Sequence, residues 1–166
     1  MEKYRPKLDL PLSETERMLD RTTLSALALL ILIPAFAYGN LPDQIPIHFN
    51  AKGEADDWAN KLYIWLFPLI GLVTAAGLHL ITKFPHTYNY PQTITPENVE
   101  RQYRNGRTMI RLVNLFDSLL FAGLTYFIVR LAKQGEGQLP IWLMPLVLLA
   151  TFALVAYSVY TAYQKE

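Results

Sequence analysis

Five side chains that could bind a cation or move a proton lie within ten residues of this 166-residue chain: His48, Asn50, Glu54, Asp56 and Asp57. Their nitrogen and oxygen atoms suit zinc and other divalent cations. A small metal-dependent membrane enzyme would use His48 and Asp56 as ligands, with Glu54 or Asp57 as general base. The spacing matches neither His-Glu-x-x-His nor a calcium loop ending in glutamate. The sequence therefore predicts no metal, no cofactor and no catalytic residue.

The same residues allow two other interpretations. In a structural interpretation, Asn50 and Asp56 bond backbone amides of a tight turn, His48 bridges strand and turn, and Trp58 covers them. In the third, the segment is a recognition surface for an extracellular peptide or a lipid headgroup. The candidate residues for ligand binding or for the cap are His48, Asn50, Gly53, Asp56, Trp58 and Lys61.

A second candidate site lies inside an apolar run. Asp117 falls about ten residues into a helix expected to start near Thr108, which places it roughly 15 Å deep. A carboxylate at that depth needs a partner, and the candidates are Asn114, Ser118, Arg111 and His79. Asn114 and Asp117 are therefore either hydrogen-bonding packing residues between helices or part of a proton-coupled transport site.

Four apolar runs must position these residues: 22–39, 62–82, 110–129 and 141–160. Each is close to the roughly 20 residues that a helix needs to cross a bilayer, and none alternates strictly as a barrel strand would. The sequence predicts one domain, residues 1–166, built as an all-α integral membrane four-helix bundle. The loop 40–61 forms a small extracytoplasmic cap between the first two helices, and the lipid bilayer is the expected surroundings.

The distribution of lysine and arginine predicts the orientation. Eleven of the 15 flank the runs on the side of both termini, including Lys3 and Lys165, and the remaining four are Lys52, Lys61, Arg130 and Lys133. Because positive segments stay in the cytoplasm, both termini are expected there. All three tryptophans, Trp58, Trp65 and Trp142, then fall at the outer ends of helices, as expected for amphipathic rings at a headgroup boundary.

Local signals predict where elements begin. Ser13 and Glu16 form a capping-box pattern, and Thr95-Pro96-Glu97 resembles a helix start. In the loop, Ile45, Ile47 and Phe49 alternate as in a short strand, followed by a turn in which glycine can adopt positive φ. The basic residues Arg104, Arg107 and Arg111 share one helix face and are expected to contact anionic lipid.

Composition excludes several classes. The formal net charge of +1 gives no concentrated basic surface, so nucleic acid is not an expected partner. With no cysteine, the chain can form no disulfide and no thiolate site. Small residues between Gly71 and Gly77 give the second run a face for close packing, either within the chain or in a homodimer.

The loop carries the pattern Leu-Pro-x-x-Ile-Pro-x-His-Phe-Asn-x-x-Gly-x-x-Asp-x-Trp-x-x-Lys over residues 41–61, here called the signature. It resembles the domain of unknown function 1648 family, as does the segment Phe-Pro-His-Thr-Tyr-Asn-Tyr-Pro. The resemblance implies a bacterial cytoplasmic membrane and no accepted catalytic residues. The best-understood relatives are longer proteins that give immunity to a sporulation-delaying toxin. We therefore expect a non-enzymatic bacterial membrane protein that acts in toxin immunity or envelope signalling through its outer loop.

Overall fold

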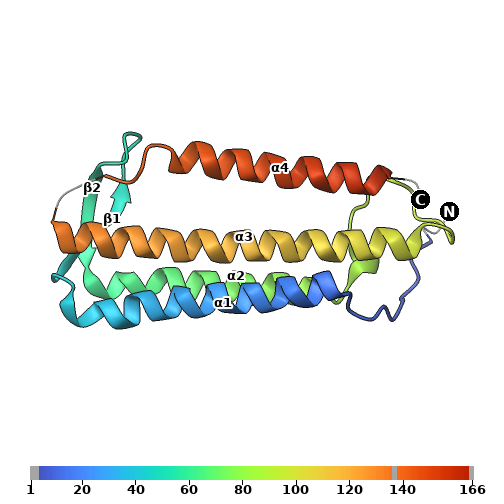
Figure 1. Ribbon diagram of the computed structural model, residues 1–166, viewed down its shortest axis with the longest axis horizontal. Helices are drawn as coiled ribbons and strands as arrows, with labels where there is room; N and C mark the ends of the chain where they lie inside the picture. The colour runs from blue at the N-terminus through green and yellow to red at the C-terminus, as the bar shows by residue number, and fades with distance from the viewer. Residues whose placement is uncertain (1–3, 136–137, 165–166) are drawn as a thin grey trace.

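The computed structural model describes residues 4–135 and 138–164. Four helices run side by side (Figure 1), and each is long and apolar enough to cross a membrane. The hairpin lies at one end of the bundle, the hairpin end, and both termini lie at the other, the terminal end. The elements are α1 (Glu14–Ala37), β1 (Gln44–Phe49), β2 (Ala55–Asn60), α2 (Leu66–Ile81), α3 (Val99–Gln134) and α4 (Leu143–Tyr163).

The predicted fold class is confirmed: the chain is mostly helical, with four membrane-length helices and one two-stranded sheet. Each predicted apolar run lies within or beside one of the helices. The 36-residue α3 is much longer than a bilayer requires, so it extends beyond the hydrocarbon region at its ends. Lys3 and Lys165, used to predict the orientation, lie outside the described residues.

The capping box at the start of α1 is confirmed. The Ser13 hydroxyl accepts from the Glu16 amide at 3.2 Å, and the Glu16 carboxylate accepts from the Ser13 amide at 2.8 Å. The start of α3 lies slightly later than predicted, at Val99 instead of Pro96. The Asn98 side chain accepts from the Thr95 amide at 2.9 Å, which closes a turn over 95–98 before the helix begins.

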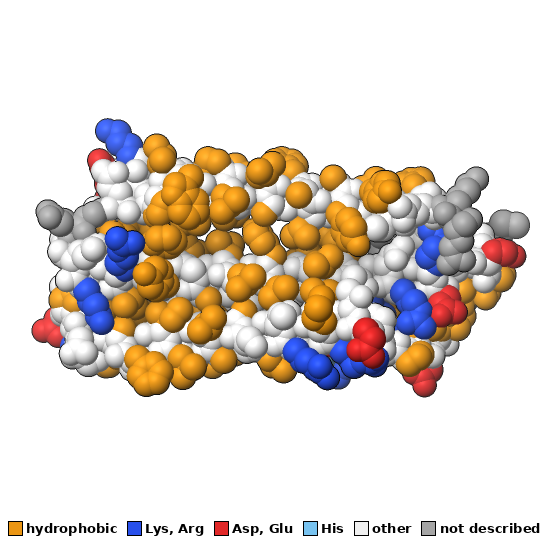
Figure 2. All heavy atoms as spheres, in the orientation of Figure 1, with side chains coloured by type: hydrophobic (Ala, Val, Ile, Leu, Met, Phe, Trp, Pro, Cys, Tyr) orange, Lys and Arg blue, Asp and Glu red, His pale blue; other side chains and the backbone are white. Residues whose placement is uncertain are grey.

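The third helix is the centre of the bundle. α1 and α2 each pack against α3 more extensively than against each other, and α4 packs on α3 but leaves most of its own surface exposed. Figure 2 shows a mostly hydrophobic middle, with charged side chains gathered toward the two ends. This distribution suits a bundle surrounded by lipid, because charged groups are costly in hydrocarbon.

An apolar cluster fastens the hairpin to the helices. Its buried members are Ala37, Leu41, Ile45, Ile64, Ile128, Val129 and Ala132. Ile47 and Phe49 pack against the same cluster, so the apolar residues predicted to alternate along β1 all face the bundle. The hairpin is therefore a rigid cap.

The terminal end is also structured. The Tyr103 hydroxyl donates to the Pro6 carbonyl at 3.1 Å, and Arg104 donates to the Pro11 carbonyl at 3.1 Å, so α3 holds the arm that precedes α1. Burial raises the pKa of Tyr88 to about 12 and the pKa of Tyr90 even more.

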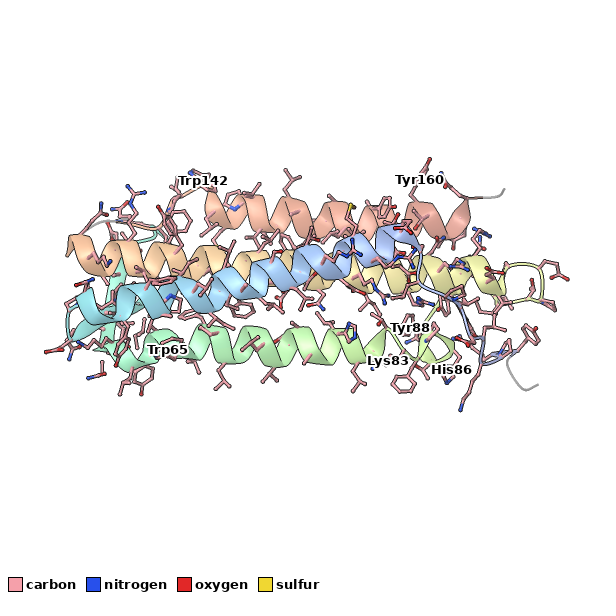
Figure 3. All side chains as sticks on the ribbon, turned by 60° about the horizontal axis from the view of Figure 1, so that its bottom comes forward. Trp65, Lys83, His86, Tyr88, Trp142 and Tyr160 are labelled. Atoms are coloured by element: carbon pink, nitrogen blue, oxygen red, sulfur yellow. The ribbon has the colours of Figure 1, made fainter. Side chains whose placement is uncertain are left out.

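Trp65 and Trp142 lie near the hairpin end, and Lys83, Tyr88 and Tyr160 lie toward the terminal end (Figure 3). These tryptophans and tyrosines thus lie toward opposite ends of the bundle.

Candidate functional site

The signature folds into the antiparallel hairpin β1–β2. Gln44 pairs with Asn60 and Pro46 with Trp58, and irregularities around His48 shift the register so that His48 lies opposite Asp57. β1 is the inner strand, with Ile45 and Pro46 buried, whereas β2 is largely exposed. The residues of the signature therefore divide into two groups, those that build the cap and those that lie on its surface.

Asn50 and Gly53 build the turn. Oδ1 of Asn50 accepts from the amides of Lys52 at 2.9 Å and Glu54 at 3.1 Å, and its Nδ2 donates to Glu54 Oε2 at 2.9 Å. Gly53 has φ of 82°, a conformation that favours glycine. The predicted turn is confirmed, including the role of Asn50 in bonding backbone amides.

The turn is clamped to the connection between α3 and α4. The Leu139 amide donates to the Gly53 carbonyl at 2.8 Å, and Gln138 Nε2 donates to Glu54 at 3.3 Å. A Cβ atom added at Gly53 would lie 2.6 Å from the Leu139 carbonyl oxygen, so this approach also requires glycine. This contact could not be predicted, because neither segment shows a sequence pattern that pairs it with the other.

Lys61 fastens the other end of the hairpin. Its Nζ lies 3.1 Å from Asp43 Oδ1 and 3.4 Å from the Leu41 carbonyl, and it sits 5.7 Å from the centre of the Tyr38 ring. These contacts join the two ends of the signature to the end of α1. Lys61 thus serves the fold of the cap.

Three signature residues form a surface that we call the hairpin patch: His48, Asp56 and Trp58. His48 Nδ1 lies 2.5 Å from Asp56 Oδ1, with the His48 side chain 68% exposed. Asp56 and Trp58 both lie on β2 and are both exposed, Trp58 to 41%. His48 does link the two strands through Asp56, whereas Asp56 and Trp58 differ from the structural interpretation. Asp56 bonds His48 instead of turn amides, and Trp58 lies open instead of covering them.

The five residues proposed as metal ligands do not converge. Glu54 bonds Asn50 and Gln138, while Asp57 accepts from the Trp58 amide at 2.9 Å. Among residues 4–135 and 138–164, no three His, Asp or Glu side chains are grouped so that they could hold a metal ion. The patch offers a carboxylate, an imidazole and an aromatic face, which together suit binding more than metal-assisted hydrolysis.

The intramembrane candidates lie in the middle of α3. Asn114 is 6% exposed, and its Nδ2 donates to the Ala75 carbonyl of α2 at 3.1 Å. Asn114 Oδ1, Asp117 Oδ2 and Ser118 Oγ are buried, and among the described residues none of them has a hydrogen-bond partner. The predicted pairing of Asp117 with Asn114, Ser118, Arg111 or His79 is therefore not observed there. Asn114 does act as a packing residue between α2 and α3.

The expectation that Arg107 and Arg111 contact lipid is wrong. Arg107 Nε lies 2.9 Å and Arg111 Nη1 3.2 Å from Glu16 Oε1, and Arg111 Nε lies 3.0 Å from Asp20 Oδ1. Glu16, Arg107 and Arg111 are buried, so we call this set, with Asp20, the buried charge cluster. Arg104 is partly exposed and pairs with Glu100 at 2.9 Å.

A sequence signal for this cluster was present. Two acids and two arginines are each spaced four residues apart on the helices they occupy, so each pair presents one face. Opposite charges on two such faces predict a helix–helix contact, whereas the basic face viewed alone suggested lipid.

Comparison with known proteins agrees with the signature. The model of the family described as domain of unknown function (DUF1648) matches residues 26–72, which covers the end of α1, the hairpin and the start of α2. An uncharacterized protein of the archaeon Archaeoglobus fulgidus is 30% identical over 154 residues, with 84% of each chain covered. No solved structure matches the chain. The chain belongs to the family of the domain of unknown function DUF1648.

Proposed function

We propose that this chain is a non-enzymatic membrane protein that recognises a ligand outside the cell at its hairpin patch. The supporting observation is that some residues of the signature build the cap while others lie exposed on its surface. Asn50, Gly53 and Lys61 are occupied in building the cap, whereas His48 and Trp58 contribute nothing comparable to its interior and are exposed. An exposed aromatic residue beside a carboxylate on a rigid support is typical of a binding surface.

An outward-facing hairpin is part of the proposal. The lysine and arginine distribution favours cytoplasmic termini, and the bundle places the hairpin at the opposite end from both termini (Figure 1). Two tryptophans near the hairpin end suit a headgroup boundary on that side (Figure 3). The patch would then stand just outside the membrane surface.

The chemistry of the patch favours a cationic peptide. Asp56 is exposed on β2, two residues from Trp58, which offers a ring face to a lysine or arginine side chain. Lys61 is paired with Asp43, and Lys52 lies in the turn, so the two lysines of the hairpin are outnumbered by the acids Asp43, Glu54, Asp56 and Asp57. The surface is therefore locally acidic and aromatic.

Immunity to a peptide toxin or envelope signalling is the cellular role that we propose for this binding. Both roles need only that a ligand is held at the membrane surface, and neither needs a reaction. A bacterial source and the inner membrane as location belong to the same proposal. The Archaeoglobus relative carries no named function that would favour another role.

The test is a binding titration on the whole protein in nanodiscs. Trp65→Phe and Trp142→Phe leave Trp58 as the single tryptophan reporter. The probe is a short lysine-rich peptide, and its glutamate-substituted counterpart serves as the control. We expect the lysine peptide to shift Trp58 emission, with D56N weakening its binding by roughly tenfold, since removing one charge of a close pair costs about that much.

Asp57→Asn is the matched control, because it removes the same charge from a neighbouring carboxylate that bonds the Trp58 amide and not His48, and it keeps an oxygen that can accept from that amide. Binding in D57N should stay close to that of the parent. Equal weakening of peptide binding in the two variants would show that the peptide responds to the overall negative charge of the hairpin and not to Asp56 in particular. Equal binding of both peptides, or no emission change, would reject the patch as a cation-recognition surface.

A further inference from the structure

A cavity of about 410 Å³ lies between α1 and α2, with α3 as its inner wall. It exists because α1 and α2 both pack on α3 and touch each other little. The lining combines polar and apolar residues from three helices: Asp20, Thr23, Leu24, Leu27, Leu72, Ala75, Ala76, His79 and Asn114. We call it the α1–α2 groove.

The polar lining of the groove consists mainly of hydrogen-bond acceptors. Asp20 Oδ1 accepts from Arg111 Nε at 3.0 Å, and among the described residues no donor reaches its Oδ2. Asn114 Oδ1 is buried and has no partner in the part of the chain that the structure describes. Thr23, whose hydroxyl can both donate and accept, lines the groove on the same helix as Asp20. An unpaired buried acceptor costs free energy, so a ligand that brings a donor to Asn114 Oδ1 would be favoured in the groove.

Cationic side chains near the groove do not supply that donor. Arg111 is already bound to Glu16 and Asp20, and Arg107 is bound to Glu16, so neither guanidinium is free for an incoming anion. His79 lies at the terminal end of the lining, near the end of α2. The acceptors left in the groove are thus Asp20 Oδ2 and Asn114 Oδ1, beside the Thr23 hydroxyl and the His79 ring, each of which can donate or accept.

The apolar part of the lining indicates that a ligand of the groove would also carry an alkyl chain. Leu24, Leu27, Leu72 and Ala76 form the rest of the walls, and Leu24 is 66% exposed, so the groove opens sideways onto the surface that lipid would cover. Asp20 lies near the start of α1, whereas Leu27 lies two turns further along it. A ligand with a polar head near Asp20 and an alkyl chain beside Leu27 would match this arrangement.

We propose that the α1–α2 groove binds an amphiphile with a primary ammonium head and an alkyl chain. An ammonium group carries three donors, which matches acceptors on Asp20, Thr23 and Asn114. A cation in this setting needs a carboxylate, and Asp20, whose Oδ1 is bound to Arg111, has Oδ2 left to accept from it. The volume lies in the range of small-ligand sites. This site is separate from the hairpin patch, and either proposal can fail alone.

The test measures binding of tritiated decylamine to the full-length protein in phosphatidylcholine nanodiscs, with empty nanodiscs as the background. Unlabelled decanol and decanoate, which share the alkyl chain but differ in the head group, serve as competitors. We expect saturable binding that decanol and decanoate displace at least about tenfold less well than decylamine does. Equal competition by all three would show partition into an apolar surface and would overturn the proposal.

Groove-filling variants locate the site. Ala76→Phe fills the α1–α2 groove and should weaken decylamine binding by about tenfold or more. Ala153→Phe is the matched control, because it makes the same change in a separate apolar groove of about 550 Å³ between α3 and α4. A loss in A153F as large as that in A76F would overturn the assignment.

Two further variants complete the test. One removes a hydrogen-bond acceptor, and the other replaces A76F if that variant does not fold. Asn114→Leu keeps the approximate volume but removes the acceptor, so it should lower decylamine affinity while leaving decanol affinity unchanged. Should A76F fail to fold, Leu24→Trp narrows the groove from its exposed side. Unchanged decylamine binding in a folded N114L protein, or in a folded L24W protein, would contradict the proposed placement.

Discussion

At the level of single residues, the signature contains residues that the fold of the turn requires and residues that it does not require. Gly53 is needed because its φ of 82° disfavours a side chain and because a Cβ atom there would lie 2.6 Å from the Leu139 carbonyl oxygen, and Asn50 is needed for the amides of the turn. His48 and Trp58 satisfy no such internal need. The turn residues could be predicted from sequence, because turn chemistry is local. Which residues remain exposed could not, because that depends on how β1 packs on the helices.

Glu16 illustrates why a residue can have a second role that sequence does not show. Its carboxylate completes the capping box of α1 and also binds Arg107 and Arg111 across the bundle. The first role involves residues three apart and could be predicted. The second joins residues more than ninety apart, so it could be found only by comparing the charge patterns of two helices.

We predict that Glu16→Gln strongly destabilises the protein. Glutamine can still accept from the Ser13 amide, so the substitution removes mainly the charge that Arg107 and Arg111 face. Leaving a buried charge without its partner typically costs about 3–5 kcal/mol. Thermal unfolding followed by circular dichroism in detergent measures the loss.

Glu14→Gln is the control for this prediction. Glu14 lies in the same turn but is exposed, and its ion pair with Arg17 is screened by solvent. The melting temperature of E14Q should therefore stay near that of the parent. Equal melting temperatures for E14Q and E16Q would contradict a stabilising role for the buried charge cluster.

At the scale of elements, the helices were easier to predict than their connections. The apolar runs and the Ser13 cap define α1 well, whereas the start of α3 was placed too early because Asn98 closes a turn that the Thr95-Pro96 pattern does not indicate. The contact between the hairpin turn and residues 138–139 was not predicted. Contacts between connections depend on the lengths and tilts of the helices, which sequence patterns do not specify.

We predict that Gly53→Ala loosens the cap. The substitution places a side chain in a left-handed conformation and against the Leu139 carbonyl, which we expect to cost about 1–3 kcal/mol. The expected result is a lower melting temperature and greater solvent exposure of Trp58, measured by fluorescence quenching in the single-tryptophan background.

Gly77→Ala makes the same substitution within α2, where a Cβ atom would meet nothing within 4 Å. Alanine is the better helix former, so the stability of G77A should be unchanged or slightly higher. If G53A matched the parent in both measurements, the clamp between the turn and Leu139 would not hold the cap in place.

At the scale of the whole molecule, the chain is a four-helix bundle whose two ends differ. The hairpin end carries the signature and a small apolar core, and the terminal end carries the arm, the buried charge cluster and the polar part of the α1–α2 groove. Segment hydropathy was enough to predict the spans. The central position of α3 was not predictable, because all four runs are apolar and only packing shows which of them contacts the others.

The central claim is a membrane-spanning bundle that presents the hairpin patch outside the cell, and single-thiol labelling tests it most directly. The chain has no cysteine, so Lys52→Cys in the exposed turn provides one thiol at the hairpin end, and Lys83→Cys provides one at the terminal end. We predict that a membrane-impermeant maleimide labels K52C in intact cells and K83C only after permeabilisation. Labelling of K83C in intact cells, with K52C protected until permeabilisation, would contradict the claim.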